Sequence, residues 1–222
     1  MKNLSDMCEI IRYTGQAVEI SKEEVFRDLC CIQESAAYEI FEQEYEQLLE
    51  LVVSCCRPAV YLKECRFPKG ISCSSLKPEE RILCGIYTIG REVSDWSTRA
   101  FFQEDYVKGM LLDTMADCAL FSMEKQMEPL LRNFCRERGM GISERCHAQD
   151  KDTMPLQRFI YEELEGRKNG FLLTAGYMFD PVKTGTVIFR LTEDPRAFCV
   201  RHTCSGCGNT SCRRRKTTNF QN

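Results

Sequence analysis

Four cysteines near the carboxyl end of the chain have the spacing of a metal site. The set lies within fourteen residues and consists of Cys199, Cys204, Cys207 and Cys212. Four thiolates can complete a tetrahedral zinc site or hold an iron–sulfur cluster. His202 could also take the place of Cys199 and give three thiolates and one imidazole, a set that suits zinc. Free thiols, or a redox pair among them, are the alternative, and the spacing leaves both interpretations open.

The total cysteine content indicates the chemical environment of the chain. Fifteen of the 222 residues are cysteine, an odd number, and two adjacent pairs stand at positions 30–31 and 55–56. The first thirteen residues show neither the basic region nor the apolar region of a secretory signal. These features disfavour a secreted disulfide framework. We therefore expect a reducing, cytoplasmic setting, in which most of the eleven cysteines before Cys199 are buried free thiols.

Composition narrows the class of protein further. The chain is 43% hydrophobic and 28% charged, which indicates a globular protein, and its net charge of −3 argues against broad nucleic-acid binding. The apolar stretches are too short to span a bilayer, so no membrane partner is expected. No nucleophile triad, phosphate-binding glycine loop or metal-hydrolase motif is present. Phosphoryl transfer and metal-dependent hydrolysis are therefore poor interpretations.

The first half of the chain is predicted to begin with helices and continue with strands. We expect a first helix over residues 5–13, and Ser21 with Glu24 forms a capping box that predicts the start of a second. Apolar residues recur at helical spacing over residues 25–52, which predicts a continuous helical run. Strands are predicted where β-forming residues gather, over residues 59–62, 71–74 and 81–90.

A long amphipathic helix is the central predicted element of the second half. It begins near Asp105, follows a shorter helix that starts at residue 91, and should be kinked or divided by Pro129. The remaining predictions are a polar connection over residues 139–152, a helix over 153–164, and strands over 171–174 and 182–191. Together they predict an α+β domain over residues 1–198. A cysteine-rich appendage over residues 199–222, ending in a basic disordered tail, is predicted to follow it.

Four sequence segments resemble a known family when they are taken in order. They are TIGREV from Thr88, DYVKGMLLD from Asp105, PLQRFI from Pro155 and LTAGYMFDPVKT from Leu173. The order and approximate gaps are similar to those of the activation domain of cobalamin-dependent methionine synthase and its stand-alone bacterial relatives. The segment EIIRYTG, which begins at Glu9, fits the same pattern, and the resemblance extends to about Asp194.

The resemblance implies a fold and a role. The fold is a twisted antiparallel sheet wrapped by helices. The role is to bind S-adenosylmethionine and to support the reductive methylation of an oxidised corrinoid, which is carried as cobalamin on another domain or protein. A flavodoxin-like or ferredoxin-like protein would supply the electron. The expected partners are therefore a corrinoid-carrying protein or methyltransferase and a protein reductant.

The resemblance also marks residues for the adenosylmethionine site. Arg145 would pair with the ligand's carboxylate through a bidentate guanidinium. The other implied ligand contacts are Tyr177, Asp180, Gln157, Glu92 and Asp113. Five of these six residues have a simpler interpretation: Arg145 as a solvated side chain beside Glu144, Tyr177 and Asp180 as turn residues before Pro181, and Glu92 and Asp113 as helix caps or ion-pair partners. Gln157 would face the ligand cleft only if its helix has the expected orientation.

The loop after Arg145 departs from the family pattern. The family has a Pro-Gly-Tyr turn in this loop, where the chain reads RCHAQD from Arg145 to Asp150. A glycine would permit close backbone approach to a ligand and a tyrosine would supply an aromatic face. The alternatives to a catalytic accessory protein are therefore a docking module with a degenerate ligand loop, or a protein whose cysteine cluster is the active part in electron transfer or zinc binding.

Overall fold

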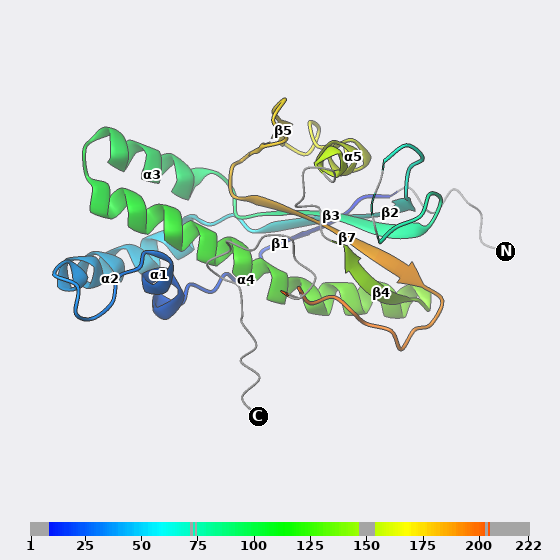
Figure 1. Cartoon of the computed structure of the whole chain (residues 1–222), viewed down its shortest axis with the longest axis horizontal. Coiled ribbons are helices and arrows are strands. Elements are labelled where there is room, and N and C mark those ends of the chain that lie inside the picture. Colours follow the sequence, from blue (N-terminus) through cyan, green and yellow to red (C-terminus); the bar gives the residue numbers. More distant parts are fainter. Residues whose placement is uncertain (1–8, 72, 74, 147–153, 203, 205–222) are drawn as a thin grey trace.

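The computed structural model describes residues 9–71, 73, 75–146, 154–202 and 204. At its centre lies a five-stranded antiparallel sheet with the strand order β1-β2-β3-β7-β4 (Figure 1). These strands are β1 (Ile11–Thr14), β2 (Ala59–Arg66), β3 (Arg81–Thr88), β4 (Gly141–Cys146) and β7 (Thr184–Thr192). A separate hairpin pairs β5 (Leu172–Leu173) with β6 (Phe179–Asp180).

Helices cover both faces of the sheet. The described residues form α1 (Lys22–Asp28), α2 (Tyr38–Cys55), α3 (Glu92–Phe102), α4 (Tyr106–Arg138) and α5 (Pro155–Glu163). Helices α1, α2 and α4 lie on one side of the sheet, and α5 lies on the other with the β5–β6 hairpin (Figure 1). This arrangement confirms the predicted α+β class, an antiparallel sheet wrapped by helices.

Strand β3 shows how the sheet separates two cores. Leu83 and Tyr87 belong to the core under α4, whereas Ile82, Cys84 and Ile86 belong to the core under α5. A strand that is buried on both faces has a nearly continuous apolar sequence, and this explains why the segment from Arg81 to Gly90 was predictable as a strand.

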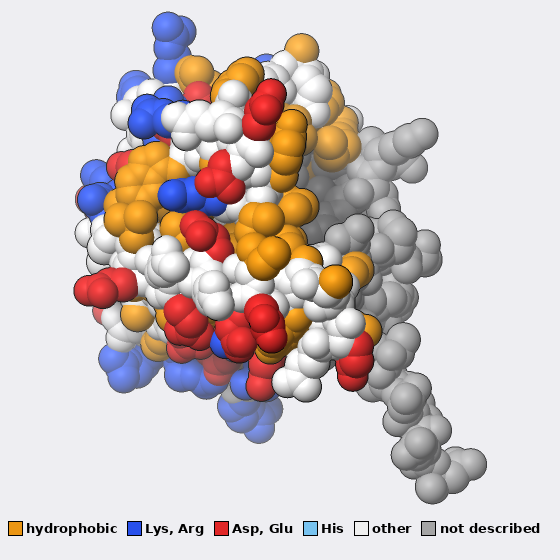
Figure 2. Space-filling model, turned by 90° about the vertical axis from the view of Figure 1, so that its left-hand side faces the viewer, with side chains coloured by type: hydrophobic (Ala, Val, Ile, Leu, Met, Phe, Trp, Pro, Cys, Tyr) orange, Lys and Arg blue, Asp and Glu red, His pale blue; other side chains and the backbone are white. Residues whose placement is uncertain are grey.

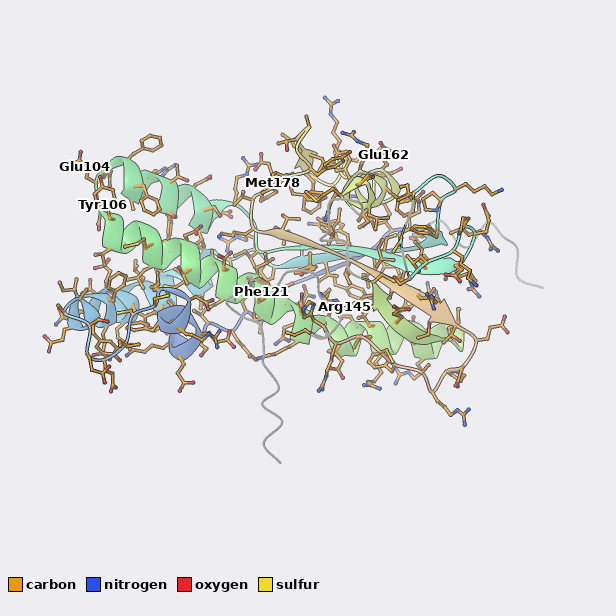
Figure 3. The ribbon with its side chains drawn as sticks, in the orientation of Figure 1. Glu104, Tyr106, Phe121, Arg145, Glu162 and Met178 are labelled. Carbon is orange, nitrogen blue, oxygen red and sulfur yellow. The ribbon has the colours of Figure 1, made fainter. Side chains whose placement is uncertain are left out.

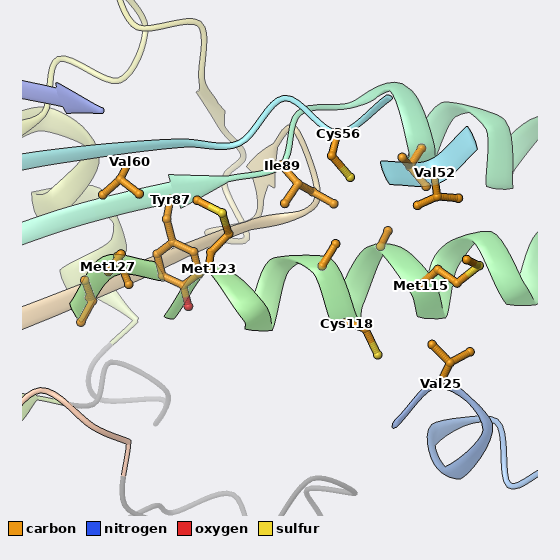
Figure 4. Packing of buried hydrophobic residues seen from close by; sticks show 14 of the residues in the cluster. Val25, Val52, Cys56, Val60, Tyr87, Ile89, Met115, Cys118, Met123 and Met127 are labelled. Atoms are coloured by element: carbon orange, nitrogen blue, oxygen red, sulfur yellow. The ribbon is translucent and has the colours of Figure 1, made fainter. Parts of the chain in front are cut away.

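Helix α4 is the main element that packs on the sheet. Its buried residues recur at helical spacing, from Leu111 through Met115 and Met123 to Leu131. Figure 4 shows Met115, Met123 and Met127 of α4 and Tyr87 of β3 in the same core, between the helix and the sheet. The Asp105 carboxylate accepts the Lys108 backbone N–H at 3.3 Å and begins the helix.

Three helix predictions are corrected by the structure. Residues 11–13 lie in strand β1, where they pair with β2, and not in a helix. The predicted run over residues 25–52 is broken between α1 and α2, because the chain turns at Cys30, which has a positive φ of 54°. Pro129 does not divide α4, which continues to Arg138.

A strand was missed where a polar connection was predicted over residues 139–152. Strand β4 lies at the edge of the sheet and pairs only with β7 among the described strands. Its sequence contains Ser143, Glu144 and Arg145, and this polar run hides the strand from a prediction based on hydrophobic periodicity.

The chain end that follows β7 packs back onto β4. We call residues 198–202 the C-terminal strap. The Cys199 backbone N–H donates to the Ile142 carbonyl at 2.8 Å, and Val200 is buried in the core under α4. The Arg132 guanidinium lies 4.0 Å from the centre of the Phe198 ring. Residues 203 and 205–222 lie outside the described residues, so the predicted appendage over 199–222 stays a prediction.

The described cysteines are free thiols. Those buried in the protein are Cys31, Cys56, Cys84, Cys118, Cys135 and Cys146. Burial raises the pKa of the Cys56 and Cys146 thiols to about 11, so both stay protonated at neutral pH and are poor nucleophiles. A packing role therefore suits the buried thiols. No helix among the described residues is both long enough and apolar enough to cross a bilayer.

Gly185 offers a test of the packing between β3 and β7. It faces Tyr87 across the two strands, and a Cβ at this position would overlap the Tyr87 ring. We expect Gly185→Ala to lower the free energy of unfolding by about 1–3 kcal/mol, because the ring must leave its place in the core. Urea denaturation measures this loss.

Gly176→Ala is the matched control for that variant. A Cβ at Gly176 would meet only the Thr174 Oγ1 atom, at 3.9 Å, so we expect little change in stability. Equal stability of the Gly185→Ala and Gly176→Ala variants would show that the close approach of Gly185 to Tyr87 is unimportant.

Candidate functional site

A β-bulge directs Arg145 toward α4. The register of β4 against β7 shifts between Ile142, which faces Leu191, and Glu144, which faces Arg190. Residues that face each other in antiparallel strands point to the same side of the sheet. Because of the bulge, Arg145 faces Phe189, which lies in the core under α4. A bulge thus re-aims a side chain at the edge of the sheet.

The Arg145 guanidinium forms a bidentate ion pair with Glu124 on α4. The Nη1 atom of Arg145 lies 2.9 Å from Glu124 Oε2, and Nη2 lies 2.7 Å from Oε1. The Tyr87 hydroxyl donates a third hydrogen bond to Glu124 Oε1, at 3.0 Å. The side chains of Arg145 and Glu124 are only 9% and 24% exposed. Arg145 is therefore not the solvated loop residue of the simpler interpretation, and Figure 3 shows it beside α4.

Burial and charge act in opposite directions on this pair. Burial alone would raise the pKa of Glu124, but the hydrogen bonds and charge of Arg145, with the Tyr87 hydroxyl, hold it below its usual value. Burial, followed by the negative charge of Glu124, raises the pKa of Tyr87. His202 in the C-terminal strap lies close to the pair, and burial together with the Arg145 charge lowers its pKa. At neutral pH the pair is thus a carboxylate and a guanidinium.

A second group of charges surrounds Lys183, the residue before β7. Its Nζ atom lies 2.7 Å from an oxygen of Asp113 and 2.7 Å from an oxygen of Asp117, both on α4. The Lys183 side chain is 8% exposed, so it needs these partners. Thr88 Oγ1 donates to the Lys183 carbonyl at 3.0 Å and holds this segment against the end of β3.

A third ion pair connects the start of α3 to the β5–β6 hairpin. The Nη2 atom of Arg91 lies 3.0 Å from both carboxylate oxygens of Asp180. The two side chains are 53% and 46% exposed. Tyr177 has a positive φ of 62°, and its ring lies 5.9 Å from the Arg158 guanidinium. Glu92 is the first residue of α3, where a carboxylate stabilises the helix amino terminus.

The edge of β7 lies between the Lys183 group and the Arg145 pair. Strand β4 stops pairing with β7 at Cys146 and Ile188, so residues 184–187 have a strand neighbour, β3, on one side only within the described structure. Phe121 of α4, which is labelled in Figure 3, is exposed between Asp117 and Glu124 in the sequence. We call residues 184–187, with the charged groups at both ends, the β7-edge site.

Gln157 lies on the opposite side of the sheet from these charges. Its side-chain oxygen accepts a hydrogen bond from Thr186 Oγ1 at 2.8 Å, and α5 carries it on the face away from α4. Of the predicted site residues, Asp113 lies on α4 and Arg145 contacts the same helix. Glu92 begins α3 and Asp180 ends β6, whereas Gln157 approaches β7 from the other face of the sheet.

The partners of the predicted site residues were not among the residues predicted from the sequence. Glu124, Tyr87, Asp117, Lys183 and Arg91 each make a hydrogen bond or ion pair with one of them or with a shared partner. A signal was available for part of this set, because Asp113, Asp117 and Glu124 recur at intervals that place them on one helix face. Their cationic partners come from distant segments, and no spacing rule could identify them.

The metal prediction is only partly covered by the structure. Cys199 is exposed and Cys204 is partly buried, whereas Cys207 and Cys212 lie outside the described residues. Over the part of the chain that is described, no group of three or more histidine, cysteine, aspartate or glutamate side chains could hold a metal ion. The four-cysteine site therefore stays a prediction.

The charges of the β7-edge site have an excess of carboxylates. At one end Asp113 and Asp117 share the single cation Lys183, and at the other end Arg145 and Glu124 balance each other. Carboxylates that exceed their cationic partners create a negative potential, which attracts a positively charged group. The arrangement therefore suits a cationic ligand better than an anionic one.

Comparison with known proteins finds a likeness of structure. No protein-family model matches the chain, and no curated protein matches it in sequence. Among solved structures, the fold is similar to that of the crystal structure of the MetH reactivation domain bound to AdoHcy, S-adenosylhomocysteine, with a TM-score of 0.56. The alignment covers 88% of this chain and 82% of that chain at 11% sequence identity. This likeness confirms the fold that the four sequence segments implied.

The Arg145–Glu124 pair gives a stability prediction. Arg145→Leu removes two of the hydrogen bonds to the Glu124 carboxylate and leaves that of the Tyr87 hydroxyl, and we expect a loss of roughly 2–4 kcal/mol of unfolding free energy at pH 7. Arg91→Leu is the control, because its pair is half exposed and should be worth no more than about 1 kcal/mol. Equal losses in the two variants would contradict the assignment of a buried pair.

Acidification adds a second test of the same pair. The folded state holds the pKa of Glu124 below its unfolded value of about 4.3, so this stabilisation is present above that pH and is lost as pH falls through the folded pKa. In the Arg145→Leu variant, burial acts without the guanidinium and should raise that pKa. The stability difference between the two proteins should therefore shrink between pH 7 and pH 4, and a constant difference would contradict this.

Proposed function

We propose that this chain is an accessory protein for the reductive reactivation of a cobalamin-dependent methyltransferase or corrinoid protein, with S-adenosylmethionine as the methyl donor. The observation that carries the proposal is the fold, which is similar to a reactivation domain whose solved structure contains S-adenosylhomocysteine. The four motifs add support, because most of the residues that they mark lie around one edge of the sheet.

The charge of the β7-edge site supports the choice of ligand. S-adenosylmethionine carries a positive sulfonium, whereas S-adenosylhomocysteine has a neutral thioether in its place. Asp113 and Asp117 share one lysine, so the two carboxylates retain a net negative charge. A sulfonium placed near them gains Coulomb energy that the thioether lacks. The site is expected to prefer the methyl donor over the product that remains after methyl transfer.

The proposed reaction needs two partners. A corrinoid-carrying protein or methyltransferase would present the oxidised cobalamin, and a flavodoxin-like or ferredoxin-like protein would deliver one electron. S-adenosylmethionine would then transfer its methyl group to the reduced cobalt and leave S-adenosylhomocysteine. The role of this chain would be to hold the adenosyl ligand beside the partner's corrinoid.

Exposed apolar residues favour a docking module as the second candidate function. Figure 2 shows hydrophobic side chains among charged ones on the end of the molecule formed by α2, α3 and α4. Phe102 is 84% exposed, and Phe101, Tyr106 and Met110 are also exposed near the connection from α3 to α4. Exposed aromatic groups of this kind are typical of protein interfaces. A recess of about 240 Å³ lined by Trp96 and Leu112 adjoins them.

The cysteine cluster is a further proposal that the C-terminal strap supports. The strap fixes Cys199 to the edge of β4 and places His202 near the Arg145–Glu124 pair. A zinc or iron–sulfur site formed with Cys204, Cys207 and Cys212 would then lie close to the β7-edge site. Metal analysis and absorption spectra of anaerobically purified protein test this, and a colourless, metal-free, folded protein would eliminate it.

Calorimetric titration tests the ligand. We expect S-adenosylmethionine to bind in the micromolar range and more tightly than S-adenosylhomocysteine. Asp113→Asn should reduce this preference by about threefold, because it removes one negative charge near the sulfonium. Glu137→Gln, near the far end of α4, should leave the preference unchanged. If neither adenosyl compound binds, the proposed function is wrong.

A pull-down experiment tests docking separately from ligand binding. We expect Phe102→Ser to weaken the capture of a corrinoid-carrying protein by about tenfold, because the most exposed aromatic residue at that end is lost. Leu172→Ser removes another exposed apolar residue, which is 54% exposed and lies in the β5–β6 hairpin, and serves as the control. Capture that persists without S-adenosylmethionine supports the docking module, and equal capture by both variants would exclude this end as the docking surface.

A further inference from the structure

We propose that Glu124 determines the ligand specificity of the β7-edge site by occupying the carboxylate-binding face of Arg145. The inference rests on the proposed function, in which this site takes an adenosyl thioether or sulfonium. It implies that the amino-acid carboxylate of such a ligand contributes little to binding, so the protein recognises the nucleoside and sulfur parts of the ligand instead.

The geometry of Arg145 supports this role for Glu124. A guanidinium binds a carboxylate best through two parallel hydrogen bonds from two nitrogens. Glu124 already accepts both, at 2.9 and 2.7 Å, from Nη1 and Nη2 of Arg145. A guanidinium has a second edge, formed by Nε and Nη2, but the Arg145 side chain is only 9% exposed, so this edge is withdrawn from a ligand. A carboxylate that reached Nη1 and Nη2 would therefore compete with an internal group of the same chemical type.

The surroundings of Glu124 make it difficult to displace. The Tyr87 hydroxyl donates to it, and Gly185 leaves the space in which the Tyr87 ring lies. If a ligand carboxylate displaced Glu124 from Arg145, the Glu124 carboxylate would keep only the Tyr87 hydrogen bond while 24% exposed. Removing one partner from a buried charged pair is costly, since the other charge stays desolvated. Replacement of Glu124 by a ligand carboxylate on Arg145 thus gains one carboxylate–guanidinium pair and loses an equivalent one.

Substitution of Glu124 by glutamine should reverse this specificity. Glutamine is nearly the same size, but its neutral amide offers one acceptor oxygen and no charge to the guanidinium. A ligand carboxylate would then form the stronger, charge-assisted pair with Arg145. The variant is therefore expected to gain affinity only for ligands that carry the carboxylate.

Calorimetric titration of the full chain at pH 7 with two neutral thioether ligands tests the proposal. S-adenosylhomocysteine carries the amino-acid carboxylate, and 5′-methylthioadenosine has the same nucleoside and thioether without it. We expect the two dissociation constants of the unmodified protein to agree within about threefold. In Glu124→Gln, S-adenosylhomocysteine should bind about tenfold more tightly and 5′-methylthioadenosine should be unchanged.

Two further variants keep the test decisive. Glu128→Gln removes a carboxylate one turn further along α4, where it pairs with Arg132, and should change neither dissociation constant. If Glu124→Gln does not fold, Tyr87→Phe removes the Tyr87 hydrogen bond that helps to hold Glu124 and should give a smaller gain, of about threefold, for S-adenosylhomocysteine alone.

The outcomes separate this inference from the proposed function. If the unmodified protein binds S-adenosylhomocysteine at least tenfold more tightly than 5′-methylthioadenosine, Arg145 is available to ligands and the inference is overturned, while the proposed function stands. Equal binding of both ligands that no variant alters also overturns it. Absence of binding by both ligands in every variant overturns the inference and the proposed function together.

Discussion

Burial of one face of α4 against the sheet is the constraint on which the charged groups depend. The helix has 33 residues and therefore extends for about 50 Å. Its apolar residues fix its rotation about its own axis, because they must face Tyr87 and the neighbouring strands. Once that rotation is fixed, Asp113, Asp117 and Glu124 project along one border of the helix. Their partners on β4 and before β7 can then meet them without any further adjustment of the backbone.

The Arg145–Glu124 and Arg91–Asp180 ion pairs differ in their physical character. Arg145 and Glu124 are largely withdrawn from water and held by three hydrogen bonds, so this pair is rigid. Arg91 and Asp180 are half exposed and come from a loop and a short hairpin, so water can replace either partner at little cost. A binding event is therefore easier to accommodate beside Arg91 and Asp180, where the two side chains can rearrange without leaving a charge desolvated.

The parts of the fold that the sequence predicted are those with strong periodicity. Strand β3 is buried on both faces and α4 has a regular apolar stripe, so both were recognisable from residue types alone. The break between α1 and α2 was missed because apolar residues continue through it at helical spacing, although Ile32 in the break and Ile40 in the first turn of α2 are both exposed. Arg145 was identified through a resemblance, yet its partner Glu124 was not, since a contact 21 residues apart depends on the tertiary fold.

The bulge in β4 also changes what a sequence alignment can say about this site. Ile142 faces the core under α4 and Cys146 faces the core under α5, although their spacing would place them on the same face of a regular strand. Whether this segment has an odd or an even number of residues thus decides whether the Arg145 guanidinium or the Cys146 thiol faces α4. Deletion or insertion of one residue between Gly141 and Arg145 would exchange the faces on which Arg145 and Cys146 lie, even if both residues were conserved. Among relatives of this chain, the length of this segment would therefore be as informative as the identity of its residues.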